Sequence, residues 1–473
     1  MTSKNKSREP APPQNSRPGH GRRKAVAAGA IIAVLSLAAA ACGSSSGSGS
    51  STPAAGSSSG SGKLSGNLSI SAQVFGAPIL APVLKAFEAA NPGVHVEESV
   101  ASSAAGTAYQ TSLLTQKLAN NLPDIVNPQD VLSPTLSTDG ITQSLSKYLA
   151  KGEPYPQSYW LQNILASYIP TIGPGKGQVY ALPNEADAVV VFYNKNEFKK
   201  AGVPYPTDKW TWSQMIADAA KLKVVKGGTQ TQWGLCDTPD WQALYNPLMK
   251  AFGVTSLSET QADLASPGSL KAWQMLVAPT QNGDAVPYAT YLSASAQCGT
   301  LFDSGQAAMF FGVRGNLPTV RPATAGKFDW DVVPMPFVQG VHGATRPTGA
   351  GSISWAMSSQ AKDTTNTIAF FKFLFSAEGQ DIAEKGYGVV PAIPSLLTAD
   401  SVWQKLPGPP DNVGAFTTAA QTGTIAPQTP NTVYNLTQTD IPKAIEGVVD
   451  NHESYAQAFG TINTAINAAY PKS

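Results

Sequence analysis

Residues 177–206 have the sequence GQVYALPNEADAVVVFYNKNEFKKAGVPYP, and this stretch decides the fold. Val179–Val191 is an apolar run that polar residues interrupt, and residues 192–194 continue it. Such a run predicts extended backbone. Glu185 and Asp187 stand two positions apart, so a strand at this place would turn both carboxylates to the same face.

Strand and helix patterns alternate upstream of this stretch. Residues 68–74 and 94–100 alternate apolar and polar side chains, which predicts two strands. Between them, residues 77–90 carry apolar side chains at helical spacing. A second helical face follows at 109–118, and residues 123–126 form a short apolar segment typical of a buried strand. This alternation indicates an α/β fold with a largely parallel sheet.

Both kinds of element continue downstream. Apolar runs predict strands at 233–235, 307–311, 328–333 and 353–357. Helical spacing predicts helices after residue 213 and at 365–375, 440–449 and 455–469. A length of 473 residues suits two or three domains.

The N-terminal segment has the parts of a secretory signal. Residues 22–24 (RRK) are basic, and residues 25–41 are apolar, rich in alanine and small at the end. Residues 39–42 (AAAC) resemble the bacterial lipobox, in which a cysteine follows small residues. We therefore predict a signal peptide at 1–41 and a lipidated Cys42. The alternative is a plain signal peptide with an incidental cysteine.

Residues 42–62 are almost entirely serine and glycine, which predicts a flexible linker. They contain GSSSG at 43–47 and again at 56–60, and both copies match the G-x-S-x-G pattern of a hydrolase nucleophile elbow. That elbow requires a strand before it and a helix after it, which this segment does not offer. The pattern is therefore no evidence for an enzyme.

The composition excludes several partners. Charged residues make up 13% of the chain and the net charge is +1, whereas binding to nucleic acid requires clustered Lys and Arg. The four histidines are far apart, and no cysteine spacing suits a metal. We expect no metal, no cofactor and no nucleic acid. If Cys42 carries lipid, Cys236 and Cys298 remain as a disulfide or as two free thiols.

Two kinds of chemistry fit the polar and aromatic residues. Glu185 and Asp187 can serve as the carboxylate pair of a glycoside hydrolase, or they can accept hydrogen bonds from sugar hydroxyls. Nine tryptophans and fifteen tyrosines supply planes on which a sugar ring can stack, although a tryptophan is more often a core residue. Nothing in the sequence favours hydrolysis over binding.

Six segments, in order, resemble the family 1 extracellular solute-binding proteins of the maltodextrin-binding type. They are LKAFEAANPGVHVE (84–97), YQTSLLTQKLANNLPDIV (109–126), the stretch at 177–206, FDSGQAAMFFG (302–312), WDVVPMP (330–336) and TGAGSISWAM (348–357). The resemblance extends from Leu68 to the C-terminus, and the stretch at 177–206 is its most specific part.

The resemblance implies an α/β, two-lobe periplasmic-binding-protein-like fold with a hinge and an interlobe ligand cleft. Lobe 1 would comprise residues 63–185 and 337–386, and lobe 2 residues 188–335 and 387–473. It also implies a non-enzymatic, monomeric lipoprotein on the extracellular face of a bacterial membrane. This protein would capture a sugar or other small polar ligand by lobe closure and deliver it to the permease subunits of an ABC transporter.

The same resemblance implies ligand contacts at particular positions. They are Gln73, Phe75, Asp130, Glu185, Asp187, Trp241, Gly349, Ala350, Tyr434 and Asn435. Where the family often has G-x-W, residues 312–316 are GVRGN, so Arg314 would take the place of the stacking tryptophan, with Asn316 beside it. An arginine there could bind an acidic sugar or hydroxyl groups, so a maltodextrin is not implied.

Two alternatives from other classes stay open at this point. The first is a tethered, secreted carbohydrate-active hydrolase, which would turn over a glycan and lose that activity when Glu185 or Asp187 is removed. The second is a structural surface protein. Such a protein would bind no solute, so no solute would raise its melting temperature.

The lipobox predicts a mature protein that begins at Cys42 with a diacylglyceryl thioether. Intact-mass analysis of the protein purified from its native membrane measures this directly. An unmodified product cleaved at another residue would refute lipidation and would leave the solute-binding assignment untouched.

Overall fold

The computed structural model describes residues 63–471, except for 75, 102–105, 172–174, 294–297, 399–400 and 406. All described residues belong to one compact unit. The predicted signal peptide, Cys42 and the serine-glycine linker lie outside the described residues.

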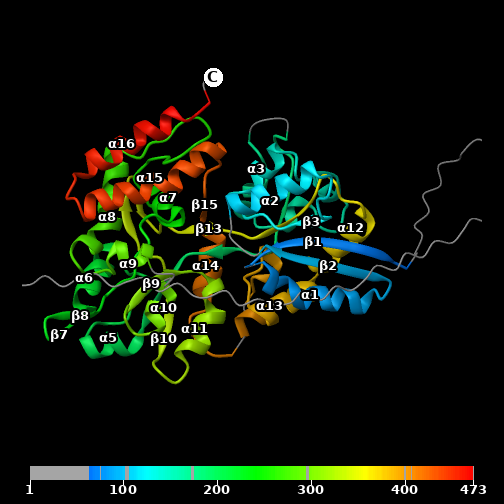
Figure 1. The fold of residues 1–473 in the computed structure, drawn as a ribbon. Coiled ribbons are helices and arrows are strands. Elements are labelled where there is room, and N and C mark those ends of the chain that lie inside the picture. Colours follow the sequence, from blue (N-terminus) through cyan, green and yellow to red (C-terminus); the bar gives the residue numbers. More distant parts are fainter. Residues whose placement is uncertain are drawn as a thin grey trace, which may run out of the picture. The chain divides into compact units, whose positions relative to one another are not determined.

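Lobe 1 is the part of the chain built around a five-stranded sheet with strand order β2-β1-β3-β14-β4 (Figure 1). β1 pairs in parallel with β2 and β3, whereas β14 is antiparallel to β3 and β4. The strands are β1 (Gly66–Gln73), β2 (Val94–Ala101), β3 (Ile125–Val126), β4 (Leu182–Pro183) and β14 (Ser354–Met357). The helices are α1 (Ala77–Ala90), α2 (Thr107–Leu118), α3 (Ser133–Thr138), α4 (Gln162–Leu165), α12 (Thr364–Leu374) and α13 (Ala377–Tyr387).

Lobe 2 is built around a three-stranded sheet with order β10-β6-β9, whose central strand is antiparallel to both neighbours. The strands are β6 (Val190–Asn194), β9 (Met309–Gly312) and β10 (Trp330–Pro334), with hairpins of β7 (Val224–Lys226) and β8 (Thr229–Gln232) and of β11 (Val338–Gly340) and β12 (Gly343–Thr345). The helices are α5 (Lys195–Ala201), α6 (Trp212–Leu222), α7 (Gln242–Ala251), α8 (Pro267–Gln281), α9 (Tyr288–Ser293), α10 (Cys298–Asp303), α11 (Leu317–Thr324), α14 (Gly414–Thr422), α15 (Asn431–Val449) and α16 (Tyr455–Ala468).

A third sheet ties together the segments that pass between the lobes. Its strands are β5 (Asp187–Ala188), β13 (Gly349–Gly351) and β15 (Thr424–Ile425), in the order β15-β13-β5. β13 is antiparallel to β5 and parallel to β15. Three segments that are far apart in sequence are therefore joined by backbone hydrogen bonds at the hinge.

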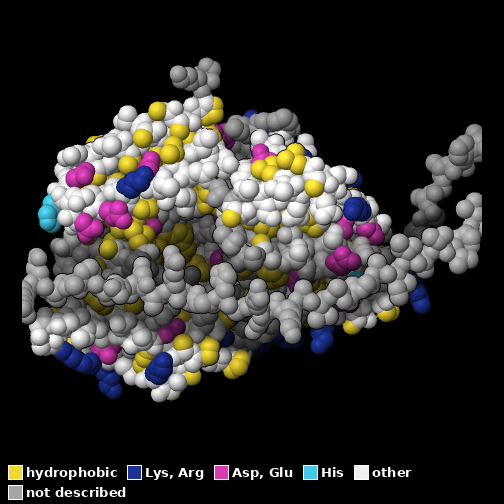
Figure 2. All heavy atoms as spheres, in the orientation of Figure 1, with side chains coloured by type: hydrophobic (Ala, Val, Ile, Leu, Met, Phe, Trp, Pro, Cys, Tyr) yellow, Lys and Arg dark blue, Asp and Glu magenta, His cyan; other side chains and the backbone are white. Residues whose placement is uncertain are grey.

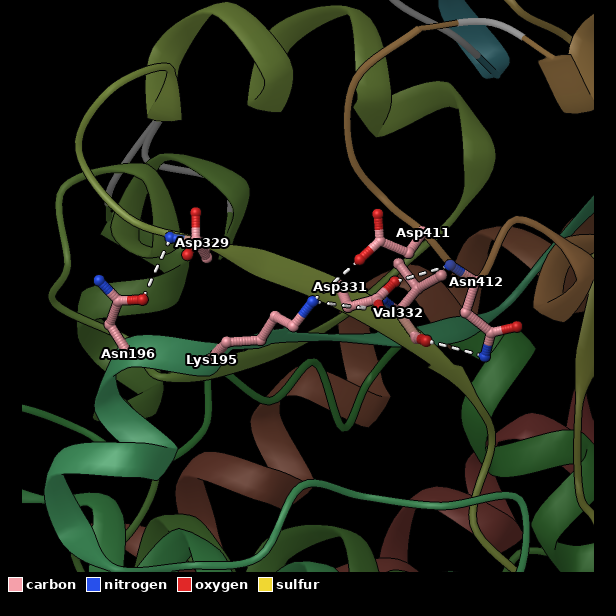
Figure 3. A network of polar contacts seen from close by, with 7 residues as sticks. All are labelled: Lys195, Asn196, Asp329, Asp331, Val332, Asp411 and Asn412. Carbon is pink, nitrogen blue, oxygen red and sulfur yellow. Dashed lines mark hydrogen bonds and ion pairs between the residues drawn. The ribbon is translucent and has the colours of Figure 1, made fainter.

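A polar network fixes the loop before α14 against β10 (Figure 3). Lys195 Nζ lies 3.0 Å from an Asp411 carboxylate oxygen and 3.8 Å from an Asp331 oxygen. The backbone N–H of Asn412 donates to Asp331 (2.9 Å), and its side-chain amide donates to the carbonyl of Val332 (3.1 Å). The Lys195–Asp411 pair is partly solvated and contributes at most about 1 kcal/mol. The bonds that involve backbone groups therefore contribute most to holding this loop on β10.

An aromatic cluster attaches α14 to the same sheet. The ring of Phe192 in β6 stacks on Phe310 at 4.5 Å and on Trp330 at 5.6 Å between centroids. Phe416 of α14 meets the ring of Phe192 edge-on at 6.1 Å. All four rings are buried, so α14 is part of the lobe 2 core.

The local patterns predicted most elements, and the structure corrects three expectations. The helix at 77–90 is confirmed by α1. The strand expected at 233–235 is wrong, because Trp233 and Leu235 form isolated bridges to two different segments and no continuous ladder results. The helix expected at 440–449 begins earlier, at Asn431.

The third correction concerns strand direction. The largely parallel sheet is present in lobe 1, whereas the lobe 2 sheet is antiparallel at each of its described pairings. β9 and β10 both run opposite to β6 and therefore run in the same direction as each other, and α11 connects them, as a crossover helix does between strands of one direction.

Gly349 lies where a side chain has no room. A Cβ atom on Gly349 would lie 2.0 Å from the carbonyl oxygen of Ala243 in α7. We expect Gly349→Ala to push β13 and α7 apart and to lower the free energy of unfolding by about 1–3 kcal/mol, as overpacking does. Urea unfolding followed by circular dichroism measures this change.

Gly460→Ala in α16 is the matched control. No heavy atom lies within 4 Å of a Cβ atom on Gly460. The substitution should therefore leave stability unchanged or raise it by up to about 1 kcal/mol, because alanine favours a helix. Equal unfolding midpoints for the two variants would contradict the packing described for β13.

Candidate ligand-binding cleft

A cavity of about 510 Å³ is lined by residues of both lobes and of the hinge sheet. Its volume lies within the usual range for sites that enclose a small molecule. The lining residues are Ile79, Gln129, Asp130, Val131, Glu185, Asp187, Val189, Trp241, Gln242, Ala243, Val313, Gly315, Asn316, Gly349, Ala350, Gly351, Ser352, Ile353, Ala426, Tyr434 and Gln438.

Asp130 enters the cavity from the loop after β3. The backbone N–H of Asp130 donates to the carbonyl of Ser352 (3.2 Å), and its carboxylate accepts from the N–H of Val131 (2.9 Å). Burial raises the pKa of Asp130 to about 7, although the backbone hydrogen bonds oppose this. The loop thus presents a carboxyl group that loses its proton near neutral pH.

Glu185 and Asp187 stand where the first crossing leaves lobe 1, and both line the cavity, although only Asp187 belongs to a strand, β5. Glu185 is 2% exposed, and burial together with the charge of Asp187 raises its pKa well above the usual value. Burial raises the pKa of Asp187 to about 6, against the opposing effects of the Gly315 N–H and the Arg314 guanidinium.

Arg314 lies behind these carboxyls and not in the cavity lining. Its side chain is 1% exposed, and its guanidinium carbon lies 5.9 Å from the centroid of the Phe416 ring. Burial lowers the pKa of Arg314 to about 10, whereas the nearby Asp187, Glu384 and Glu185 raise it. The expectation that Arg314 would face the ligand is therefore corrected, because its charge is directed at protein carboxyls.

Two aromatic side chains form the lobe 2 wall. Trp241 immediately precedes α7 and is half-buried, with its indole packed against the lobe 2 core. Tyr434 lies in the first turn of α15 and is also half-buried. Burial and the charge of Asp130 both raise the pKa of Tyr434, so the two side chains are close enough to interact.

A side-chain hydrogen bond joins the lobes near this wall. The amide nitrogen of Asn431 in α15 donates to the side-chain oxygen of Gln110 in α2, at 3.3 Å. Residues of the two lobes are thus in direct contact across the cleft.

The other predicted lining residues are engaged by the protein. The Asn316 side-chain oxygen accepts from the N–H of Val313 (2.8 Å), and the Gly349 carbonyl accepts from the N–H of Val189 (2.9 Å). Ala350 pairs with strands on both sides. These residues line the cavity, but part of their hydrogen-bonding capacity is already used.

Besides Arg314, three predicted residues are not placed at the cavity. Gln73 is buried, and its side-chain nitrogen donates to the Asn127 carbonyl at 2.5 Å. Asn435 is exposed and does not belong to the lining. Phe75 lies outside the described residues.

Three glutamines that no sequence pattern indicated also line the cavity, Gln129, Gln242 and Gln438. Gln438 follows Tyr434 by four residues on α15, so a helix assigned from Asn431 would have placed both on one face. Gln129 and Gln242 each adjoin a predicted residue in sequence. Whether their side chains reach the cavity depends on how the surrounding segments fold, which no local pattern indicates.

A second chamber of about 420 Å³ adjoins the first and shares Trp241 and Asn316 with it. It adds Asp240, Tyr291 and Gly299, among others. Burial raises the pKa of Asp240.

A disulfide joins Cys236 and Cys298, with Cα atoms 5.4 Å apart. Cys298 itself lines the second chamber. The cleft therefore extends into lobe 2.

The charge of the lining differs from that of the outer surface. Acidic and basic side chains are interspersed over the face seen in Figure 2. The residues that line the two chambers include four acids and no Lys, Arg or His. In the part of the chain that the structure describes, no group of His, Cys, Asp and Glu suits a metal ion. None of the described helices is long and apolar enough to span a membrane.

Two α/β lobes, a hinge sheet and a polar cleft define a protein that encloses a small solute. Residues 71–381 match the family model described as bacterial extracellular solute-binding protein, and the chain belongs to this family. The predicted family is confirmed, and with it the expectation of a binding protein and not an enzyme.

The curated relatives share only about a quarter of their residues with this chain over the aligned part. A protein of Brucella abortus, named only as a binding protein, is 27% identical over 237 residues, which are 49% of this chain and 53% of that protein. The sn-glycerol-3-phosphate-binding periplasmic protein of Pectobacterium atrosepticum is 25% identical over 301 residues, or 61% of this chain and 66% of that protein. The chain therefore spans about half to two thirds of the length of these relatives.

Solved structures confirm the predicted fold. An ABC substrate-binding protein from Listeria monocytogenes matches with a TM-score of 0.69 and 23% identity, over 85% of this chain and 98% of that one. The sugar-binding protein MalE from Xanthomonas citri matches with a TM-score of 0.69 and 18% identity, over 85% of this chain and 97% of that one.

The buried carboxyls predict that the unliganded protein loses stability as the pH rises. An acid whose pKa is raised on folding binds its proton more tightly in the folded state, so stability falls between the unfolded and folded pKa values. For Asp130 this window extends from 3.8 to about 7. We expect Asp130→Asn to raise the melting temperature, with a gain that grows from pH 5 to pH 7.5.

Thermal melts at several pH values measure this difference. Asp450→Asn, at an exposed residue after α15, is the control and should show no such growth. A gain that shrinks with rising pH would mean that Asp130 is stabilised as a carboxylate.

Proposed function

We propose that this protein is the substrate-binding component of a bacterial ABC importer and that it captures a sugar or oligosaccharide by lobe closure. The observation that carries the proposal is the composition of the cavity. Asp130, Glu185 and Asp187 offer carboxyl oxygens to hydroxyl groups, and Trp241 and Tyr434 offer aromatic faces to the C–H side of a sugar ring. Sugars present both kinds of surface on one ring.

The ligands named for two solved structures with this fold support a carbohydrate as the solute. The Listeria monocytogenes protein was solved with cycloalternan, and another structure with this fold contains mannotriose. The extension of the cleft into a second chamber gives room for more than one sugar ring.

A phosphate ester is the competing ligand, because several curated relatives are named for sn-glycerol-3-phosphate. A phosphate group is usually held by Arg, Lys or backbone N–H groups. The lining has no basic side chain, and Arg314 is 1% exposed behind Glu185 and Asp187. Each carboxyl of the main cavity that is ionised, such as Asp187 with a pKa of about 6, would repel a dianion, so the cavity favours a neutral or cationic solute.

The proposal includes lobe closure and a membrane anchor. A solute that contacts Asp130 on lobe 1 and Trp241 on lobe 2 stabilises the arrangement in which the lobes approach each other. A lipid on Cys42 and the linker at 42–62 would keep this monomer near its permease on the outer face of the membrane. We also propose that lobe 1 comprises residues 63–185 and 337–386 and that lobe 2 comprises residues 188–335 and 387–473.

We expect Asp187→Ala and Trp241→Ala each to weaken sugar binding at least tenfold. Removing a hydrogen bond to a charged group costs about 1.5–3 kcal/mol, and a tenfold change in affinity corresponds to about 1.4 kcal/mol. The ligand comes from a thermal-shift screen of mono- and oligosaccharides, and isothermal titration calorimetry measures the affinities.

Asn435→Ala is the control, because Asn435 is exposed and neighbours the lining residue Tyr434. Its affinity should equal that of the unmodified protein. Unchanged affinity in both cleft variants would count against this placement of the ligand. A screen in which only amino acids or metal ions raise the melting temperature would overturn the sugar proposal.

A further inference from the structure

The charge of the cleft narrows the class of sugar further. Asp130, Glu185 and Asp187 line the main cavity, Asp240 lines the second chamber, and neither lining contains a basic residue. Carboxylates in a partly desolvated site are costly unless a positive charge compensates them. A solute that carries a positive charge would therefore gain more binding free energy in this cleft than a neutral solute would.

Two of these carboxyls have unused hydrogen-bonding capacity inside the protein. Glu185 is 2% exposed and lines the cavity, and no described residue donates a hydrogen bond to its carboxyl group. One oxygen of Asp187, Oδ1, is buried without a hydrogen-bond partner. Acceptors of this kind are costly to bury, so each favours a ligand that brings a donor.

The nearby cations do not balance these acids. Arg314 interacts with Asp187, Glu384 and Glu185, and Arg321 adds a second positive charge beside it. Asp130, on the lobe 1 side, forms no ion pair within 4.0 Å among the described residues. Three carboxyl groups, those of Asp187, Glu384 and Glu185, thus share the Arg314 guanidinium, which lies outside the cavity lining.

We propose that the solute is a cationic saccharide, an amino sugar or an oligosaccharide that contains one, whose ammonium group binds at Glu185 and Asp187. This inference rests on the proposed function. The ammonium group donates up to three hydrogen bonds, which suits the open acceptors of the two carboxyls. It also supplies the positive charge that the cavity lacks.

The remaining lining favours a sugar over a linear polyamine. Gln129, Gln242 and Gln438 offer neutral donors and acceptors that suit hydroxyl groups. Trp241 offers a flat apolar face to a ring. A polyamine has no hydroxyl groups and would leave the amides without partners.

Calorimetric titration of the mature protein at pH 7 tests the inference with matched sugars. The probes are glucosamine, N-acetylglucosamine and glucose, the corresponding galactose and mannose series, and the di- and trisaccharides of chitosan, chitin and cellulose. Spermidine is included as a polyamine. Within at least one series we expect the amine to bind at least tenfold more tightly than both neutral forms.

Isosteric variants separate charge from shape. Glu185→Gln and Asp187→Asn keep the size and one hydrogen-bonding oxygen, but neither variant side chain can become a carboxylate beside an ammonium group. Each should reduce the ratio of amine to hydroxyl affinity at least tenfold. Asp450→Asn should leave that ratio unchanged, because this residue is exposed and does not line the cleft.

The outcomes distinguish this inference from the proposed function. Neutral sugars that bind as tightly as their amines would overturn the inference and leave the sugar receptor standing. Binding of spermidine without any sugar would overturn the saccharide class. If no sugar of either kind binds, the proposed function itself is overturned.

Discussion

The pairing of β5, β13 and β15 is the interaction on which the rest of this structure depends. These strands come from three distant parts of the chain, and their backbone hydrogen bonds hold the lobes at one place. The same sheet builds the floor of the cleft, because Asp187 belongs to β5 and Gly349 to β13. Since Gly349 has no side chain, α7 can approach β13 closely, and Trp241 at the start of α7 faces the cavity as a result.

The cleft is an electrostatically unfavourable place in the absence of a solute. Glu185 and Asp187 are buried near each other, and burial is the main reason that their pKa values rise. Arg314 compensates them only in part, because Glu384 shares its charge. Outside the cleft, carboxyls such as Asp411 are solvated and pair with lysine at little cost. This contrast marks the cleft as the place where a bound ligand contributes most to the stability of the protein.

The fold and the ligand are decided by different parts of the chain. Structures with 18–23% identity share the fold at a TM-score of 0.69, so the arrangement of lobes tolerates extensive sequence change. Solute identity depends on the few side chains that line the cleft. None of the described residues that line the cleft is basic, whereas several curated relatives are named for sn-glycerol-3-phosphate.

The sequence by itself determined the local elements and the likeness to a family. Helical spacing at 77–90 predicted α1, and the two-residue spacing of Glu185 and Asp187 predicted that a strand would turn both carboxylates to one side. Such patterns depend only on neighbours along the chain, and they are therefore visible before folding.

Only the tertiary structure decided which residues meet. Arg314 lies behind the cleft and Gln73 is turned toward Asn127, because packing from segments far away in sequence closes over both. β6 pairs with β9 and β10, both of which come from a part of the chain more than 100 residues later. Gln129, Gln242 and Gln438 reach the cavity from three separate segments. No pattern within one segment indicates such a meeting, because it depends on how the lobes fold around the hinge sheet.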